Sequence, residues 1–501
     1  MKSSVVAVLL ALVAAPASAA RLGPKQPFDY AAVIEKARAA AKKPYVKAPD
    51  PHAEVLATIT GEVANRIYFD HDKALWVDVA GAPKIEFFHR NTYFREKVRM
   101  YVVESGQARE VLYDTAMYDY GASRLAKTLP EDLGFAGFRV MNPHNAETDW
   151  LAYLGASYFR AATPFDQYGI SARAIAIDSG FKDEEHPRYT DVWFEQRGAD
   201  LRITAYVDGP SVAGVVRFDV HVAGDAIMDV QANYFARKDV RRLGLAPLTS
   251  MYWYGERDRR YITDWHPEVH DSDVLVIQTA GGEQIARPLQ NPKLTVTSTF
   301  DADDVRGFGL LQRDRDPEHY LDEIFHYERR PNLWVEPTKP FGKGKVMLLE
   351  LATAEDVNDN TVAFWVPAAP VKAGASFALA YKLHWTAQQP RRPPVAEVRS
   401  TRVGWGGSPP APNVRRFAVE LEGGLLEKLP ADATVVPVVT VARGTVERPQ
   451  VTRVGDGKRW RAQFDLREPG DAPVDIRMFL KSGTQVLSET WLYQYRPGDD
   501  G

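Results

Sequence analysis

Downstream of residue 200 the chain alternates apolar and polar residues with a period of two. Leu201 to Val207 is one such run and Val216 to Val222 is another. A period of two places every second side chain on the same face of a strand, so each run predicts a strand with one face in a core. Turn pairs such as Asp208-Gly209 and Asn291-Pro292 separate the runs. This pattern predicts a large antiparallel β-sandwich and disfavours βαβ units.

One segment near the N-terminus has a helical composition instead. Residues 28 to 43 are alanine-rich, with Asp29 placed as a possible N-cap and Pro44 as a stop. We therefore expect one amphipathic helix in this segment, ahead of the strands.

The alternation breaks at Gln389 to Pro394 (QPRRPP), which is followed by the glycine- and proline-rich segment Gly404 to Pro412. Clean alternation resumes beyond it, for example from Trp460 to Leu466 and from Val474 to Leu480. We expect a linker near residue 390, a large sandwich over residues 21–390, and a small immunoglobulin-like sandwich within 391–501. We also expect no sheet to cross the linker.

The composition and net charge of the chain exclude several classes of function. With 501 residues, of which 45% are hydrophobic, the chain can bury at least one large core. The formal net charge of -4 gives no basic signature, so we expect no nucleic-acid partner. The sequence has no cysteine, which excludes disulfides, cysteine nucleophiles and thiolate metal sites.

The first 20 residues are typical of a signal peptide. Lys2 supplies the positive start, Val5 to Ala15 is apolar, and Ala17-Ser18-Ala19 suits signal peptidase. The apolar run is too short to span a bilayer, and no later stretch reaches the roughly 20 residues needed. We therefore predict an exported protein without membrane insertion.

Candidate chemistry concentrates between Gly307 and Pro367. This stretch mixes aromatic residues with acids and arginines. Sugars present C–H faces to aromatic rings and hydroxyls to charged groups, so the mixture is typical of a carbohydrate site. The alternative is that the aromatics are buried in a β-protein core. Within the stretch, Asp359 stands between two asparagines just before an apolar run, which predicts a loop-to-strand corner facing a cleft.

Seven strings in the chain resemble the periplasmic glucan biosynthesis protein G/D family, and the resemblance runs from about Phe28 to Trp491. The strings are Leu133–Arg139 (LGFAGFR), Leu154–Arg160 (LGASYFR), Tyr168–Arg173 (YGISAR), Leu243–Met251 (LGLAPLTSM), Glu268–Ser272 (EVHDS), Gly307–Arg313 (GFGLLQR) and Asn358–Asn360 (NDN). The resemblance implies a periplasmic protein with a mutarotase-like sandwich and an immunoglobulin-like sandwich. It also implies a role in making osmoregulated periplasmic glucans, whose backbone is β-1,2-linked glucose.

The same resemblance implies the roles of three residues. Members of the family are described as inverting β-1,2-glucanases or as transglycosylases. Their acid falls on Asp359, their base on Asp271, and a tyrosine of their proton relay on Tyr327. An inverting hydrolase needs such an acid and base, and the acid must keep a raised pKa to stay protonated near neutrality. The alternatives are that Asp271 orders a turn and that Tyr327 is a packed core residue.

Other residues carry weaker expectations. Trp334, Arg313 and Arg315 are candidates for binding sugar, with packing as the alternative. Glu268, His270 and Asp271 lack a second histidine at a ligand spacing, so we expect no metal, and we expect no cofactor.

The chain departs from the family pattern at Gln284 to Gln290, where typical members carry a tryptophan-rich string. We expect this change to alter the sugar subsites.

Two classes of function therefore stay open. The first is an enzyme that cleaves or transfers within β-1,2-glucan. The second is a non-catalytic binding or scaffolding partner of the inner-membrane glucan synthase. The presence of aspartates at the acid and base positions, Asp359 and Asp271, favours the enzyme. The altered stretch Gln284 to Gln290 leaves the scaffolding function as the alternative.

Overall fold

The computed structural model describes residues 20–123, 125–257, 264–430, 432–455 and 457–499. Strands dominate these residues and helices are few and short, so the predicted all-β class is confirmed. The predicted signal segment, apart from Ala20, lies outside the described residues. Among the helices of the described part, none is long and apolar enough to cross a membrane.

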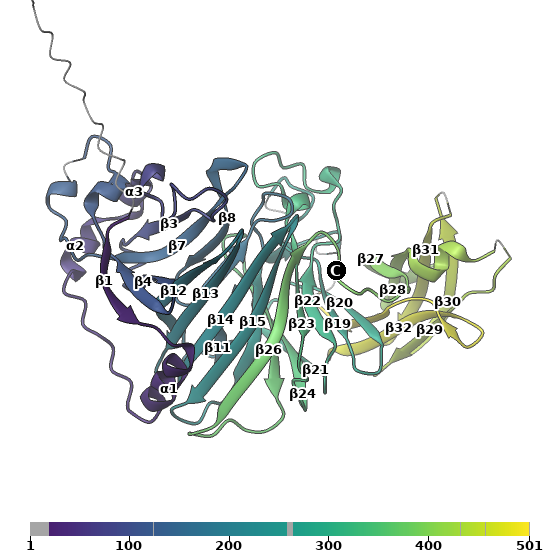
Figure 1. Ribbon diagram of the computed structural model, residues 1–501. Coiled ribbons are helices and arrows are strands. Elements are labelled where there is room, and N and C mark those ends of the chain that lie inside the picture. The colour runs from purple at the N-terminus through teal and green to yellow at the C-terminus, as the bar shows by residue number, and fades with distance from the viewer. Residues whose placement is uncertain (1–19, 124, 258–263, 431, 456, 500–501) are drawn as a thin grey trace, which may run out of the picture.

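The longest sheet has 16 strands and runs through the whole molecule (Figure 1). Its strands, in spatial order, are β1 (Leu22–Pro27), β5 (Gln107–Val111), β4 (Arg99–Glu104), β12 (Arg188–Arg197), β13 (Asp200–Asp208), β14 (Val212–Ala223), β15 (Asp225–Ala236), β26 (Ser376–Thr386), β23 (Asn332–Pro337), β22 (Gly307–Leu311), β19 (Val274–Gln278), β20 (Gln284–Pro288), β34 (Thr490–Tyr495), β32 (Val474–Ser482) and β29 (Val436–Val441), with β33 (Gln485–Val486) beside β32.

A second sheet of 10 strands packs against the N-terminal part of the first. It contains β21 (Val296–Asp301), β24 (Gly344–Glu350), β25 (Thr361–Pro367), β16 (Leu243–Ser250), β10 (Ser171–Arg173), β9 (Tyr158–Ala161), β8 (Asn145–Leu154), β7 (Phe135–Asn142) and β3 (Ile85–His89), with β11 (Ile175–Ile177) beside β16. Two short pairs complete this region, β17 (Tyr252–Tyr254) with β18 (Val269–His270) and β2 (Tyr68–Phe69) with β6 (Tyr118–Asp119).

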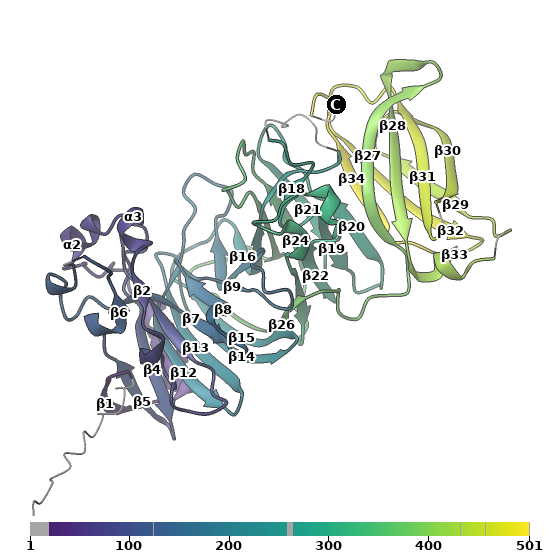
Figure 2. The ribbon, with the colours of Figure 1, turned by 90° about the horizontal axis from the view of Figure 1, so that it is seen from above.

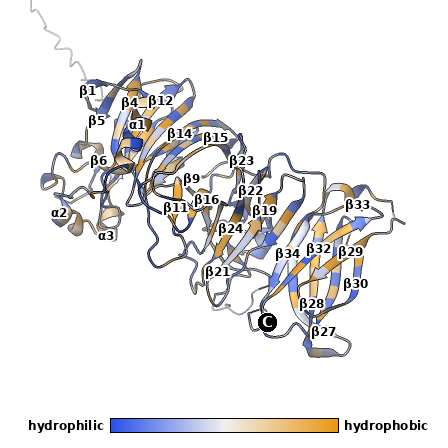
Figure 3. Ribbon diagram, turned by 90° about the horizontal axis from the view of Figure 1, so that it is seen from below, coloured by the Kyte–Doolittle hydropathy of each residue, from blue (hydrophilic) through white to orange (hydrophobic). Residues whose placement is uncertain are grey.

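The predicted alternation explains how the two large sheets form one core. Ile203 and Phe218 from the first sheet and Phe159 and Leu248 from the second are all buried in the same hydrophobic cluster. Burial of these facing rows is the main favourable term in folding such a sandwich. Figure 3 shows apolar and polar residues interleaved along β14 and β15.

The helix predicted over residues 28–43 is confirmed as α1 (Tyr30–Ala41). Asp29 caps it by accepting the backbone N–H groups of Ala31 and Ala32. Its apolar face packs on the outer side of the long sheet, where Val33 and Ala37 are buried. Two shorter helices, α2 (Ala53–Thr58) and α3 (Gly61–Ala64), follow it.

The C-terminal region adds a four-stranded sheet of β27 (Glu397–Gly407), β28 (Pro410–Glu422), β31 (Arg459–Arg467) and β30 (Thr445–Val454). Residues 387–395 contain no strand, as expected of the predicted linker. The expectation that no sheet joins the two regions is wrong. β20 pairs in parallel with β34, so the long sheet continues from one region into the other (Figure 2). The division into two domains at residue 390 stays a prediction.

A buried ion pair reinforces this junction. The two terminal guanidinium nitrogens of Arg313 each lie 2.7 Å from a carboxylate oxygen of Glu489, and the two side chains are 5% and 0% exposed. Arg313 also donates to the carbonyl of Val398, and Glu489 accepts the N–H of the same residue. Each charge thus has the partners that make burial tolerable.

Replacing Arg313 by methionine should strongly destabilise the chain, because it leaves the Glu489 carboxylate buried without its counter-ion. We expect the free energy of unfolding, measured by urea denaturation, to fall by about 3–5 kcal/mol.

The matched control is Arg467→Met, which breaks the half-exposed pair of Arg467 with Glu447. That change should lower the free energy of unfolding by about 1 kcal/mol or less. Equal, small losses in the two variants would show that the Arg313 pair does not hold the junction.

Candidate functional site

Asp271 lies directly after β18, at the end of the short β17–β18 pair. Its backbone N–H donates to the carbonyl of Met251 at 2.8 Å, which fixes the start of the turn. The side chain is 10% exposed, and its Oδ1 lies 3.5 Å from Nε of Arg330. That Oδ1 is buried and has no hydrogen-bond partner among the described residues. It is therefore an acceptor that a water or a substrate hydroxyl can use.

Asp359 lies at the loop-to-strand corner that the sequence predicts, two residues before β25 begins. The next residue, Asn360, fixes the corner. Its amide oxygen accepts the N–H of Tyr252, and its amide nitrogen donates to the carbonyls of Tyr252 and Leu351. The Asn360 side chain thus attaches the corner to β17. Because β17 pairs with β18, this places Asp359 in the neighbourhood of Asp271.

Tyr327 is buried in a cluster that includes Trp253, Val269 and Tyr320. It begins a short 3-10 helix, η6 (Tyr327–Arg329). Its hydroxyl donates to Oδ2 of Asp356 at 3.4 Å. Burial raises the pKa of Tyr327, and the charges of Asp271 and Asp356 raise it further. The ring is therefore packed as in the alternative interpretation, while the hydroxyl stands within the electrostatic field of Asp271.

The surroundings of Asp359 favour its protonated form. Burial raises the pKa of Asp359 to about 6, and the negative charge of Asp271 adds to the effect. Asp359 has exposed surface, yet protein atoms crowd its carboxyl. The crowding removes water from the charged group and so raises its pKa, whereas the open side leaves room for a ligand. A raised pKa is what a general acid needs in order to stay protonated near neutrality.

Burial also raises the pKa of Asp271, while Arg330, His270 and Arg160 lower it. The repulsion between Asp271 and Asp359 is mutual, and it raises the pKa of Asp359. The two carboxyls share one electrostatic environment without direct contact between them among the described hydrogen bonds.

Three arginines, Arg160, Arg173 and Arg330, complete the site, and our sequence analysis did not single them out. All three lower the pKa of Asp359, so each stands within electrostatic reach of it. Arg330 also lies over the Tyr327 ring at 4.9 Å. Arg160 and Arg173 end two of the strings that carry the family resemblance, which is the signal that points to them.

The residues expected to bind sugar are placed elsewhere, and the packing alternative holds for them. Trp334 is 1% exposed in the core, where its ring packs against Gly307 and Gly309. A Cβ at Gly307 would lie 2.4 Å from this ring, which explains the glycine. Arg313 forms the buried pair at the junction. Arg315 donates to the carbonyls of Glu328, within η6, and Arg330, directly after it.

The expectation that the aromatics between Gly307 and Pro367 offer stacking faces also needs correction. Six of them are at most 4% exposed, namely Phe308, Tyr320, Tyr327, Trp334, Phe364 and Trp365. Phe325, in contrast, is open, at 51% exposed. It is held near the site, since its carbonyl accepts a hydrogen bond from Gln167 and its ring lies 6.3 Å from that of Tyr327.

The altered stretch Gln284 to Gln290 contains β20 (Gln284–Pro288) and is buried throughout. Arg287 pairs with Glu350, and Gln284 donates to Gln389 and Glu489. These contacts lie at the junction of the two regions. In this chain the stretch therefore offers no exposed surface for stacking on a sugar. That the change alters the sugar subsites stays a prediction.

Glu268, Asp314 and His319 are the one group among the described residues whose possible metal ligands lie within 4.8 Å of one another. Their atoms already have partners, since His319 Nδ1 lies 2.6 Å from Asp314 Oδ2 and Glu268 Oε2 lies 3.0 Å from His270 Nε2. We assign no metal to this group.

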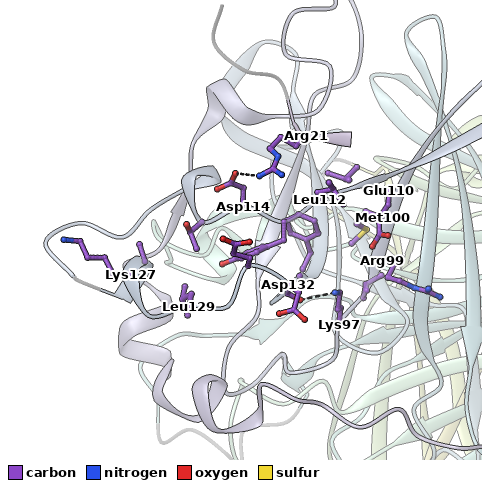
Figure 4. Close-up of a pocket in the computed structure, with 18 residues that line it drawn as sticks. Arg21, Lys97, Arg99, Met100, Glu110, Leu112, Asp114, Lys127, Leu129 and Asp132 are labelled. Carbon is purple, nitrogen blue, oxygen red and sulfur yellow. Dashed lines mark hydrogen bonds and ion pairs between the residues drawn. The ribbon is translucent and has the colours of Figure 1, made fainter. Parts of the chain in front are cut away.

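A separate hollow of about 520 Å³ lies in the N-terminal part, between β4 and β5 and the segment 126–135 (Figure 4). Arg21 and Asp114 form an ion pair in its wall, and Lys97 donates to the carbonyl of Asp132. None of the predicted site residues lines it. We therefore place the candidate site at Asp271 and Asp359.

Comparison with known proteins agrees with the resemblance. The family model described as "Periplasmic glucan biosynthesis protein, MdoG" matches residues 28–495. Glucans biosynthesis protein D 2 of Ralstonia nicotianae is 45% identical over 500 residues, covering 96% of this chain and 93% of that protein. Glucans biosynthesis protein D of Stenotrophomonas maltophilia is 43% identical over 491 residues, covering 96% and 92%. Because the family match spans nearly the whole chain, this protein belongs to the periplasmic glucan biosynthesis protein family.

Proposed function

We propose that this protein acts in the periplasm on the β-1,2-linked glucose backbone of osmoregulated periplasmic glucans, by inverting cleavage or transfer. The observation that supports this most is the pairing of two carboxyls with raised pKa values, Asp359 and Asp271, in one arginine-lined environment. Inverting glycosidases use one carboxylic acid and one carboxylate in this way. Membership of the glucan biosynthesis family supplies the substrate class.

In the proposed reaction Asp359 is the general acid. With a pKa of about 6, a usable fraction of its carboxyl is protonated near neutrality. It donates this proton to the glycosidic oxygen as the bond to the anomeric carbon breaks. The exposed side of Asp359 gives the leaving oxygen access to the proton.

Asp271 is the general base in this scheme. The attacking water or sugar hydroxyl loses its proton as it bonds to the anomeric carbon, and the proton passes to Asp271. Its unpartnered Oδ1 is available as the acceptor. The Tyr327 hydroxyl, held by Asp356 and close enough to feel the charge of Asp271, serves as the relay. Water at the acceptor position gives hydrolysis, and a sugar hydroxyl there gives transfer.

Replacing Asp359 by asparagine keeps the shape of the side chain but removes its acidic proton. We expect turnover of linear β-1,2-glucan, measured by release of reducing ends, to fall by about two to four orders of magnitude. Asp301→Asn is the matched control, because the Asp301 side chain is 93% exposed on the edge strand β21.

The control should retain the turnover of the unchanged chain. If Asp359→Asn also retained it, Asp359 would not be the general acid. If the unchanged chain bound β-1,2-glucan without cleaving or transferring it, the scaffolding alternative would replace the enzyme.

Replacing Tyr327 by phenylalanine deletes one hydroxyl and leaves the packed ring in place. If the hydroxyl relays the proton, turnover should fall while glucan affinity, measured by calorimetry, stays nearly unchanged. An interaction made only in the transition state behaves in this way.

Tyr320→Phe is the control for this change. Tyr320 lies in the same buried cluster, and its hydroxyl donates to the carbonyl of Asp314. Loss of the Tyr320 hydroxyl should change the free energy of unfolding but leave glucan turnover unchanged. Equal turnover in the two variants would mean that Tyr327 only packs.

A further inference from the structure

Gln312 is a buried residue that the proposed reaction does not use. It lies directly after β22, and its backbone N–H donates to the side-chain oxygen of Asn332, the first residue of the neighbouring strand β23, at 2.8 Å. The long sheet therefore holds its backbone in place. A buried glutamine amide needs partners for its N–H donors and for its oxygen. The partners of this amide lie in the two segments that carry Asp271 and Tyr327.

The first partner is the peptide group in front of Asp271. Nε2 of Gln312 donates to the carbonyl of His270 at 2.9 Å. This carbonyl belongs to the peptide group that joins His270 to Asp271. The N–H of the same peptide group donates to the carbonyl of Met251 at 2.8 Å. Because a peptide group is planar, hydrogen bonds on both of its sides fix where the Asp271 side chain begins.

The second partner is the backbone of Tyr327. Nε2 of Gln312 also donates to the carbonyl of Tyr327 at 3.0 Å. Tyr327 is the first residue of η6, which is a single short turn and has little stiffness of its own. One side-chain amide therefore connects the segment that carries the proposed base with the segment that carries the proposed relay.

The ring of His270 fixes which way the amide points. Carbonyl oxygens can only accept, so the amide nitrogen faces them, and Oε1 of Gln312 lies 2.8 Å from Nδ1 of His270. Nε2 of His270 lies 3.0 Å from Oε2 of Glu268. Burial lowers the pKa of His270, but the hydrogen bond and charge of Glu268, together with Asp273 and Asp314, raise it to about 9. The ring is therefore an imidazolium that donates from both nitrogens to two acceptors.

We propose that Gln312 is a positioning residue, whose single amide sets the placement of Asp271 relative to Tyr327. This proposal rests on the proposed function and goes beyond it, because it assigns a role to a residue that does not touch the substrate. Among side chains, only an amide offers donors to two carbonyls and an acceptor to a histidine from one end group. Misplacing a catalytic group by about 1 Å can lower a rate by about 100-fold.

The first test is the kinetics of the full chain and of Gln312→Met, which keeps a long buried side chain but makes none of these hydrogen bonds. We expect kcat on linear β-1,2-glucan to fall by about 100-fold while KM stays nearly unchanged. Gln312→Glu is a second variant, in case the first does not fold. Its carboxylate can accept from His270 but cannot donate to the two carbonyls, so kcat should fall in the same way.

Thr401→Val is the control for a buried hydrogen bond lost away from the site. The Thr401 hydroxyl accepts the indole N–H of Trp491 at 3.0 Å, and both residues are buried in the C-terminal region. This variant should lose stability and keep its kcat. If a folded Gln312 variant turns over glucan as fast as Thr401→Val, Gln312 supports the fold only and the proposal is wrong.

The second test does not depend on turnover. Amide hydrogen exchange of the full chain should speed up in residues 268–273 and 327–330 of both Gln312 variants, and more there than elsewhere, whereas Thr401→Val should leave both segments protected. Unchanged protection of these segments in the Gln312 variants would overturn the proposal. Absence of cleavage or transfer by the unchanged chain is a separate result. It would refute the proposed function, while the exchange rates would still decide whether Gln312 fixes the two segments.

Discussion

Removal of water from two carboxyl groups is the physical constraint on which the site depends. Burial raises the pKa values of both Asp271 and Asp359, which opposes their ionisation. Arg160 and Arg330 oppose this effect at both carboxyls. The balance leaves Asp359 with a pKa of about 6, close to the pH at which an acid catalyst can both hold and release a proton. If more water surrounded the Asp359 carboxyl, its pKa would lie closer to the ordinary value and it would lose its proton at a lower pH.

The scaffold keeps the two carboxyls in place. Asp271 follows a two-residue strand, and Asp359 lies on a loop, so neither position is rigid by itself. The Asn360 side-chain amide fixes the loop that carries Asp359, because it hydrogen-bonds to both the N–H and the C=O of Tyr252. Loop residues fixed on a large sandwich in this way combine access with order. The pairing of β20 with β34 joins this scaffold to the C-terminal region.

Much of the fold could be predicted from the sequence, because alternation and helix capping are local signals. The runs around Leu201 and Val216 became β13 and β14, and Asp29 caps α1 as expected. The continuous sheet could not be predicted, since the pairing of Ile285 with Thr490 joins residues far apart in sequence.

For the site, the family strings led to Asp271, Asp359 and Tyr327, and the structure brings these into one environment. Residue type alone suggested that Trp334 and Arg313 bind sugar, but both side chains are buried, and residue type does not reveal burial. An aromatic or arginine suited to sugar is equally suited to a core or a buried ion pair.

The most direct measurement is the difference in free energy of unfolding between the unchanged chain and Asp359→Asn, followed from pH 4 to pH 8. The folded pKa of about 6 lies above the ordinary 3.8, so the folded chain binds the proton more tightly than the unfolded chain. Ionised Asp359 therefore destabilises the folded state fully above pH 6 and not at all below about pH 4. The asparagine variant should gain stability relative to the unchanged chain as the pH rises through this window. A stability difference that does not change with pH, or that changes in the other direction, would contradict a carboxyl held protonated by its surroundings.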